Sequence, residues 1–161
     1  MDIPKTEVLT VGDRRVTFER PEPPNTAELQ SGIEPLVKAS VFADELLPDN
    51  LDRADGAPLR LLQNEHVRLD LSKRRKADMG FWHRSADFSE IIFCVSGALT
   101  WETEIGTVTL YPGEFILIPR GVAHRSRLAP ESSDENVLLE IKVDGDLDPT
   151  EIMAQVFDQA R

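Results

Sequence analysis

Alternating apolar and polar residues predict short β-strands along most of this chain. Residues 6–18, EVLTVGDRRVTFE, contain two β-prone runs on either side of Gly12-Asp13 and predict a β-hairpin. Similar runs predict further strands at 36–42, 60–63, 66–71, 90–95, 115–118 and 136–143. About ten short strands separated by regularly spaced turns are typical of an all-β sandwich or barrel.

Two segments interrupt the strand pattern. Residues 21–26, PEPPNT, are rich in proline and predict an extended connector, with Thr26 capping a short helical turn that runs to Gln30. Residues 47–58, LPDNLDRADGAP, are dense in Asp, Pro and Gly and predict a loop.

The C-terminal end predicts the one good helix of the chain. Asp148 is a candidate N-cap, followed by Pro149 at the first helical position and by Glu151 three residues after the cap. We therefore expect a short helix over 148–160 whose apolar stripe packs on the barrel or on a partner. The residues of this stripe are Ile152, Met153, Val156 and Phe157.

The length of the chain predicts one domain. A chain of 161 residues has no room for a second substantial core. We expect a single domain over 1–161, with N-terminal strands and the connector in 1–65, the core motifs in 81–128 and the helix at the end.

The composition restricts the cellular compartment and the classes of binding partner that we expect. The chain has 29 acidic and 18 basic residues and a formal charge of −11, which disfavours nucleic acid and anionic membranes as partners. No apolar run approaches the roughly 20 residues that span a bilayer, and no signal-peptide pattern begins the chain. The single cysteine, Cys94, excludes an internal disulfide and is expected to be a buried apolar filler. These features predict a cytoplasmic protein.

Candidate chemistry lies between residues 81 and 124. His83, Glu90 and His124 are the candidate metal ligands. His124 follows a Pro-Arg-Gly turn and begins an alternating run, so it should project from a strand. His83 and Glu90 have opposite parity, so they converge only if the chain turns or bulges at 85–89, and we expect them on two neighbouring strands.

The motifs in this stretch resemble those of the cupins. The second cupin motif, G(x)5PxG(x)2H, is met by Gly113, Pro119, Gly121 and His124. The Glu(x)6Gly part of the first motif is met by Glu90 and Gly97, whereas Ser85 replaces its second histidine. The resemblance implies a double-stranded β-helix, the cupin jelly-roll barrel.

Within the cupins, the segments HRSADFSEIIF and LTWETEIGTVTLYPGEFILIPRGVAHR are similar to the catalytic-domain motif of homogentisate dioxygenases and their shorter relatives. That resemblance implies a non-haem Fe(II) dioxygenase that cleaves a dihydroxylated aromatic, with iron held by His83, Glu90 and His124. Two imidazoles and one carboxylate leave coordination positions open, as such chemistry requires, but they also suit Zn, Mn or Ni. A substrate carboxylate would be neutralised by an arginine, and the candidates are Arg84, Arg120 and Arg125.

Alternatives remain open at this stage. A cupin without the usual fourth ligand is also interpretable as a non-catalytic module that binds a small molecule and lacks a functional metal site. An unpaired edge strand favours a homodimer.

The polar face of 66–71, which carries His66, lies either in solvent or on the pocket wall. We expect a solvent or structural role for His66 itself. The basic run 72–76 predicts a solvated turn, and Trp82 and Trp101 are expected in the core or in an interface.

Overall fold

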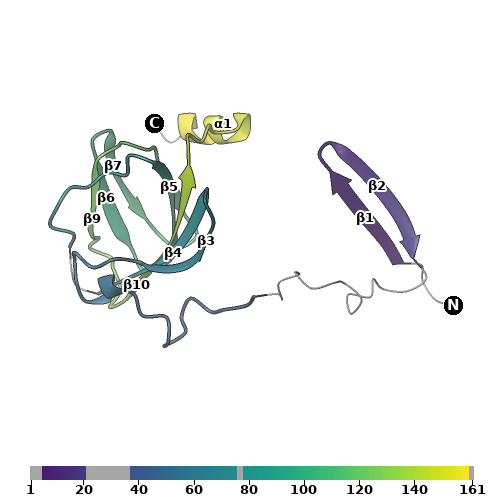
Figure 1. Ribbon diagram of the computed structural model, residues 1–161. Helices are drawn as coiled ribbons and strands as arrows, with labels where there is room; N and C mark the ends of the chain where they lie inside the picture. The colour runs from purple at the N-terminus through teal and green to yellow at the C-terminus, as the bar shows by residue number, and fades with distance from the viewer. Residues whose placement is uncertain (1–4, 21–36, 76–77, 160–161) are drawn as a thin grey trace. The chain divides into compact units, whose positions relative to one another are not determined.

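A computed structural model describes residues 5–20, 37–75 and 78–159 (Figure 1). The chain divides into two compact units, Met1–Lys38 and Ala39–Arg161, which are described separately below. The predicted connector at 21–26 and the helical turn at Thr26 lie outside the described residues.

The first unit contains a β-hairpin formed by β1 (Lys5–Val11) and β2 (Arg14–Arg20). The two strands pair antiparallel, from Lys5 opposite Arg20 to Val11 opposite Arg14. Gly12 turns the chain with a φ of 57°, in the left-handed region that glycine adopts without strain. The hairpin predicted from the sequence is therefore confirmed.

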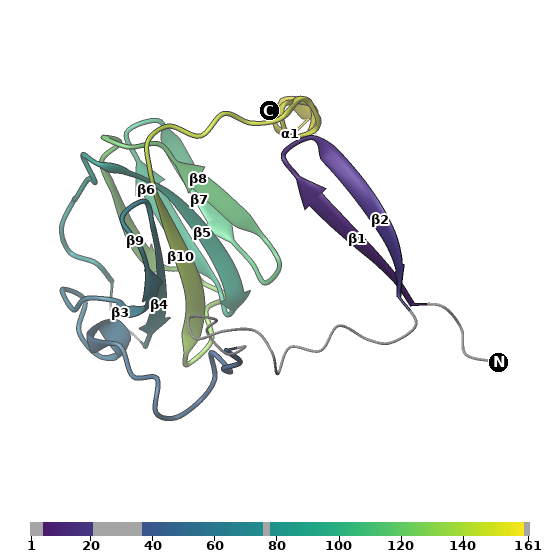
Figure 2. The ribbon, with the colours of Figure 1, turned by 45° about the vertical axis from the view of Figure 1, so that its right-hand side comes forward.

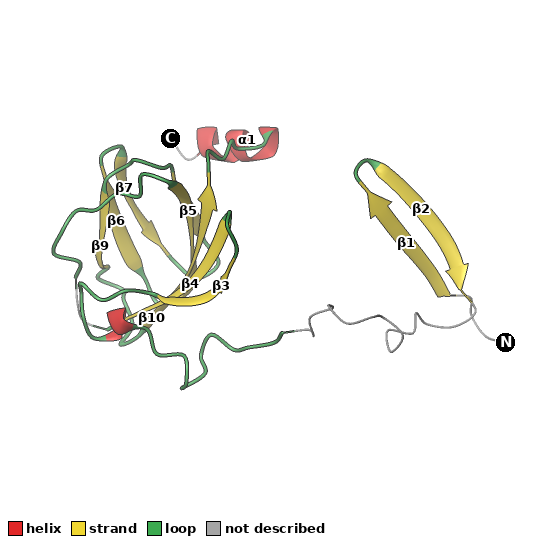
Figure 3. Cartoon of the chain, in the orientation of Figure 1, coloured by secondary structure: helices red, strands yellow, loops and turns green. Residues whose placement is uncertain are grey.

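The second unit consists of two antiparallel sheets and one α-helix. A five-stranded sheet has the order β3-β4-β10-β5-β8, and a three-stranded sheet has the order β7-β6-β9. Figure 2 shows the two sheets as facing layers, and Figure 3 shows the loops that join them. The strands of the first sheet are β3 (Leu59–Gln63), β4 (Val67–Arg74), β10 (Asn136–Asp144), β5 (Phe88–Ser96) and β8 (Phe115–Ile118). Those of the second are β7 (Gly106–Leu110), β6 (Leu99–Thr103) and β9 (His124–Leu128).

This arrangement confirms the all-β prediction and most of the expected strands. One expected strand, 36–42, was wrong, because the described part of that range, 37–42, is irregular and ends in a turn. Its apolar side chains have no core to join: Val37 and Phe42 are 76% and 57% exposed. The predicted loop at 47–58 is confirmed, apart from a single 3-10 turn at Asp49–Leu51.

The C-terminal helix α1 spans Glu151–Gln159, three residues shorter at its start than expected. Of its apolar stripe, Met153 lies against the outer face of β5 and β8, where it lines a groove with Ile91, Phe115 and Leu117. Ile152 is 71% exposed and so makes no such contact. Among the helices of the described residues, none has the length and hydropathy needed to cross a membrane.

The space between the two sheets is apolar at one end and polar at the other. The apolar end is a cluster of buried side chains from both sheets, namely Ile92, Cys94, Leu99, Trp101, Leu110, Ile118 and Leu138. Cys94 is fully buried there and burial raises the pKa of its thiol, so its expected role as an apolar filler fits its surroundings. Burying this cluster stabilises the barrel and holds the strands in register around the polar end.

Candidate metal centre

The polar end of the barrel encloses a cavity of about 220 Å³. Its wall combines side chains of β4, β5, β6, β9 and β10 with the loops at 49–58 and 79–83. The lining residues that carry charge or a metal-binding atom are Arg74, Met79, His83, Glu90, His124, Glu140 and Lys142. The three residues that the sequence predicted as metal ligands therefore line one cavity.

His83 and His124 are held together by their backbones. The His83 N–H donates to the His124 carbonyl at 3.0 Å, and the His124 N–H donates to the His83 carbonyl at 2.8 Å. Their rings are 4.2 Å apart between centroids and inclined by 61°. His83 thus forms an isolated bridge to the first residue of β9, and the expectation of a strand beside the one carrying Glu90 was wrong.

His124 is oriented by the turn that precedes its strand. Its ring is 2% exposed, and its Nδ1 lies 3.0 Å from the Val122 carbonyl oxygen. A carbonyl oxygen only accepts, so Nδ1 carries a proton, and Nε2 is the ring nitrogen that is left to bind a metal. Nε2 lies 4.0 Å from Oε2 of Glu90. This is the orientation in which a histidine binds a metal through Nε2 while a backbone acceptor fixes its tautomer.

Glu90 reaches the cavity because β5 alternates strictly between the two faces of its sheet. Glu90, Ile92 and Cys94 are buried on the inner face, and the residue opposite Glu90 on β10 is Lys142. Burial raises the pKa of Glu90, whereas the positive charge of Lys142 and His124 opposes the shift. The carboxylate is therefore an acceptor in a largely water-free position.

His83 is half-buried and incompletely hydrogen-bonded. Its Nδ1 is buried without a hydrogen-bond partner among the described residues. Its pKa is lowered to about 4, first by burial and then by the charges of His124, Lys142 and Arg74. The ring is therefore neutral at neutral pH and has a free nitrogen, which are the two requirements of an imidazole ligand.

The donor set fits a divalent metal in kind, although its spacing is wider than in a loaded site. Donors that share a zinc or iron ion at about 2.0–2.2 Å lie roughly 3 Å from one another, compared with 4.0 Å between His124 and Glu90. As they stand, no three His, Cys, Asp or Glu side chains in the described ranges are grouped closely enough to hold a metal ion.

Ser85, at the position of the second cupin-motif histidine, accepts hydrogen bonds from backbone N–H groups. Its hydroxyl accepts a hydrogen bond from the Phe88 N–H at 3.1 Å, and its carbonyl accepts one from Gly121 at 2.6 Å. The first bond closes the turn that the opposite parity of His83 and Glu90 requires. The serine therefore shapes the site and is absent from the cavity wall.

The three arginines proposed as carboxylate-binding groups lie on the surface. Arg84 pairs with Glu104, Arg120 with Asp146 and Arg125 with Glu102. All three side chains are at least 38% exposed, and the cavity wall contains none of them. The structure thus separates these arginines from the candidate ligands.

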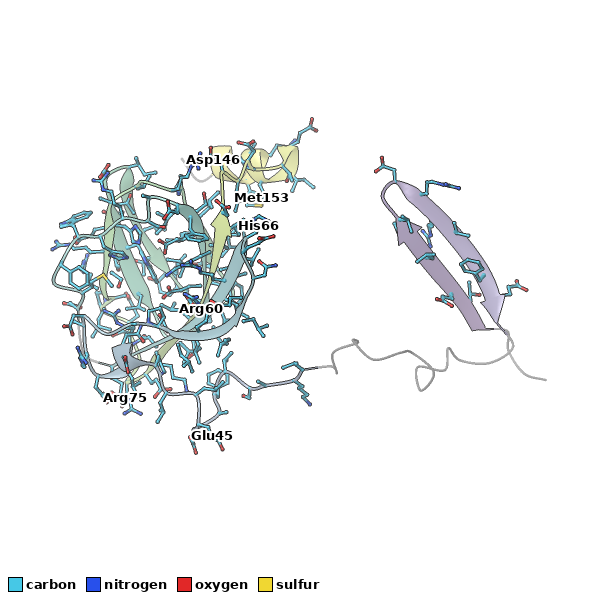
Figure 4. The ribbon with its side chains drawn as sticks, viewed as in Figure 1. Glu45, Arg60, His66, Arg75, Asp146 and Met153 are labelled. Atoms are coloured by element: carbon cyan, nitrogen blue, oxygen red, sulfur yellow. The ribbon has the colours of Figure 1, made fainter. Side chains whose placement is uncertain are left out.

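His66 is also remote from the cavity, and its side chain is 66% exposed beside Glu65 and Asp144. Figure 4 places it at the opposite end of β4 from Arg75.

Sequence reasoning left open which way the polar face of 66–71 in β4 turns, and it missed the charged inner face of β10. Asp70, Ser72 and Arg74 alternate along β4, and Leu138, Glu140 and Lys142 alternate along β10. The alternation was visible in both strands, but it does not say which face is inside. The expected solvated turn at 72–76 was wrong for Lys73 and Arg74, which are both only 3% exposed.

Comparison with known proteins places these features among cupins. A family described as "AraC-like ligand binding domain" matches residues 66–154. The solved structure of a protein from Ralstonia eutropha, provisionally titled a mannose-6-phosphate isomerase, covers 68% of this chain and 100% of its own, with 22% identity and a TM-score of 0.56. An RmlC-like cupin with a double-stranded β-helix fold from Methanocaldococcus jannaschii covers 71% and 94%, with 17% identity and a TM-score of 0.52.

One curated relative carries the name of an enzyme. A protein of Saccharolobus solfataricus, provisionally named a dioxygenase, is 29% identical over 66 residues. The match covers 41% of this chain but only 17% of the relative. This chain therefore spans a small part of that protein. The solved structures confirm the predicted cupin jelly-roll fold.

Proposed function

The chain belongs to the AraC-like ligand-binding domain family and has the cupin fold, and from this premise we propose that it is a metal-dependent oxidoreductase of the dioxygenase type. The observation that carries the proposal is the convergence of His83, Glu90 and His124 on one cavity, with a free nitrogen on each ring. The substrate we propose is a small, dihydroxylated aromatic molecule.

The three proposed ligands have complementary roles. His83 and His124 would supply neutral imidazoles, and Glu90 would supply the negative charge that offsets part of the charge of a divalent ion. Fe(II) is the ion we propose, with Zn, Mn and Ni as the alternatives to be tested. When bound, Fe(II) supplies the electrons that activate O₂, which no side chain of this cavity provides.

The remaining cavity wall suits a flat, partly apolar ligand. Met79, Phe81 and Trp101 line it together with the proposed ligands. Trp101 is 3% exposed and belongs to the apolar cluster, so it is a rigid wall that excludes water. A cavity of about 220 Å³ limits the substrate to a small molecule.

Two sequence similarities support oxidation as the chemistry. The sequence of the motif region is similar to that of homogentisate dioxygenases, and the Saccharolobus relative is provisionally named a dioxygenase. The second similarity is weaker because it covers a small fraction of that relative.

The test is metal analysis of the purified protein, followed by oxygen-uptake assays with 2,5-dihydroxyphenylacetate and related dihydroxylated aromatic acids. We expect about one iron per chain and oxygen uptake that depends on it. His124→Ala should abolish both while the protein stays folded, because it removes the ligand whose orientation the turn fixes.

The matched control is His66→Ala, which removes the exposed histidine outside the cavity and should leave metal content and oxygen uptake unchanged. Full activity in His124→Ala would refute the proposed function.

A second candidate function is binding without catalysis. The description of the family as a ligand-binding domain favours it. A binding module would take up a small molecule in the same cavity without iron and without oxygen uptake. Near-stoichiometric redox-active metal in the purified protein would count against this alternative.

A further inference from the structure

Arg74 is a buried cation with two nitrogen atoms that lack a hydrogen-bond partner among the described residues. It ends β4, and the residue is 3% exposed. Its Nε and Nη2 are buried and make no hydrogen bond with any described residue. The adjacent Arg75 behaves differently, since its side chain is 48% exposed and pairs with Glu135 at 3.0 Å.

Arg74 faces the cavity of the proposed metal centre. It lies opposite Asn136 on β10, on the inner face of the sheet, and it lines the same wall as His83, Glu90 and His124. The guanidinium is therefore directed to the space in which a ligand would lie.

The two acidic groups that act electrostatically on Arg74 are bonded to other residues. Glu140 accepts a hydrogen bond from the Ser72 hydroxyl and lies 3.5 Å from Nζ of Lys142. Asp78 accepts from the Leu128 N–H at 2.7 Å. Burial lowers the pKa of Arg74, and these two carboxylates only oppose the shift at a distance. Since a guanidinium keeps its proton, the protein holds a buried charge whose Nε and Nη2 have no hydrogen-bond acceptor among the described residues.

Such a charge is costly unless something neutralises it. A buried ion without a partner destabilises the folded state, so native proteins seldom retain one outside a binding site. The other cation of the wall, Lys142, has partners: its Nζ lies 3.5 Å from both Asp70 and Glu140. Arg74 is the group left for a ligand among the charged residues described in this wall.

The net charge of the cavity wall also favours an anionic ligand. Arg74 and Lys142 balance Glu90 and Glu140, so a bound divalent metal would leave the cavity with two net positive charges. An anionic ligand neutralises this excess, whereas a neutral one does not. The planar fork of a guanidinium matches the oxygens of a carboxylate or a phosphate.

We propose that this cavity binds a small organic oxyanion, a carboxylate or a phosphate, whose charged group is hydrogen-bonded by Arg74. The inference deepens the proposed function by naming the substrate class, and it rests on that function only for the metal at the other end of the ligand. It replaces the surface residues Arg84, Arg120 and Arg125 as the carboxylate-binding group.

The test is isothermal titration of the full-length protein with benzoate, with its neutral analogue benzamide and with inorganic phosphate. We expect saturable binding of one benzoate or one phosphate per chain, and which of the two binds identifies the oxyanion. Benzamide should bind at least about tenfold more weakly than the preferred anion, because it lacks the charge that Arg74 requires.

Two substitutions locate the binding group. Arg74→Met should weaken binding of the anion at least about tenfold, and it should raise the urea midpoint of the ligand-free protein because it removes an unpaired buried charge. Arg74→Lys keeps the charge without the fork and should bind with intermediate affinity, which preserves the test if the methionine variant does not fold. Arg120→Met is the matched control, since it changes an exposed arginine paired with Asp146 and should bind as the wild type does.

The outcomes separate this inference from the proposed function. Failure of the wild type to bind either anion, equal binding of benzamide, or unchanged binding by both Arg74 variants would overturn it. Metal content, measured on the same samples, should be identical in wild type and Arg74→Met because Arg74 is not a ligand. If Arg74→Met loses anion binding but keeps its metal, the result supports the inference. If the wild type contains no metal but still binds the anion through Arg74, the result refutes only the metal proposal.

Discussion

At the scale of single residues, the barrel depends on buried polar side chains that bond to backbone. Asn136 is completely buried. Its Oδ1 accepts from the Ala98 N–H at 2.9 Å, and its Nδ2 donates to the carbonyls of Arg74 and Ser133, both at 3.1 Å. It thereby joins the ends of β4 and β10 to the turn between β5 and β6. Gly97 is required beside it, because a Cβ there would come within 2.1 Å of Oδ1.

Asn136→Ala should lower the free energy of unfolding by about 3 kcal/mol, because it leaves the Ala98 N–H and the Arg74 carbonyl buried without these partners. Urea denaturation measures the effect. Asn64→Ala is the control: Asn64 is exposed and its Oδ1 also accepts two backbone N–H bonds, from His66 and Val67. Water can replace those bonds, so we expect a loss of at most about 1 kcal/mol. Equal losses in the two variants would show that the burial of Asn136 is immaterial.

For Ser85 we predict a role in stability and none in metal binding. Ser85→Ala should cost about 1 kcal/mol of stability, because it removes the hydrogen bond from Phe88 that closes the turn. Metal content should stay at the wild-type level, and Ser85→Thr, which keeps a hydroxyl, should restore stability. Metal loss in the alanine variant, measured by elemental analysis, would instead make the hydroxyl a ligand.

At the scale of the strands, the five-stranded sheet carries apolar side chains on its outer face. Phe93 and Phe115 lie opposite each other on β5 and β8 and are 36% and 46% exposed. A second apolar groove on the same sheet is formed by Leu62, Val67, Leu69 and Ile141 with two polar neighbours. Apolar surface gathered on one sheet face is typical of a protein interface, and β8 is also an edge strand.

We therefore propose that this face forms a homodimer. Phe115→Glu should convert the dimer to a monomer, measured as mass by light scattering, because it places a charge in the apolar contact. Its metal content should not change. Ile105→Glu is the control, since Ile105 is 73% exposed in the turn between β6 and β7, away from this sheet. A wild-type protein of monomer mass would refute the dimer.

At the scale of the whole molecule, every component of the proposed centre belongs to the unit Ala39–Arg161. The residues that line the cavity run from Asn50 to Lys142, and the buried apolar cluster lies between Ile92 and Leu138. The hairpin of the first unit supplies none of these described residues.

A fragment comprising residues 39–161 should therefore fold and bind metal as the full chain does. The expected result is an unchanged metal stoichiometry and an unchanged urea midpoint, because no cavity or core residue is removed. Loss of metal from a folded fragment, judged by circular dichroism, would assign a functional role to residues 1–38.

Local sequence signals predicted most of the elements and the candidate ligands. The hairpin at Gly12-Asp13, the strands around Glu90 and His124, and the turn at Ser85 follow from turn residues and β-propensity within short stretches. The strand expected at 36–42 failed because the same local apolar pattern was present without a sheet to join. Propensity describes a preference of the segment, whereas pairing depends on the neighbours that the fold supplies.

The sequence by itself determined which residue types recur with strand periodicity and where the motifs of the cupins fall, since both are properties of short segments. Only the tertiary structure decided which face of each strand is inside. Along β4 and β10 the face with Arg74, Glu140 and Lys142 turns inward and an apolar face turns outward, the reverse of the usual arrangement. A period of two leaves both orientations possible, and the closure of two sheets around one cavity selects between them. That selection is what separates the buried Arg74 from the surface arginines.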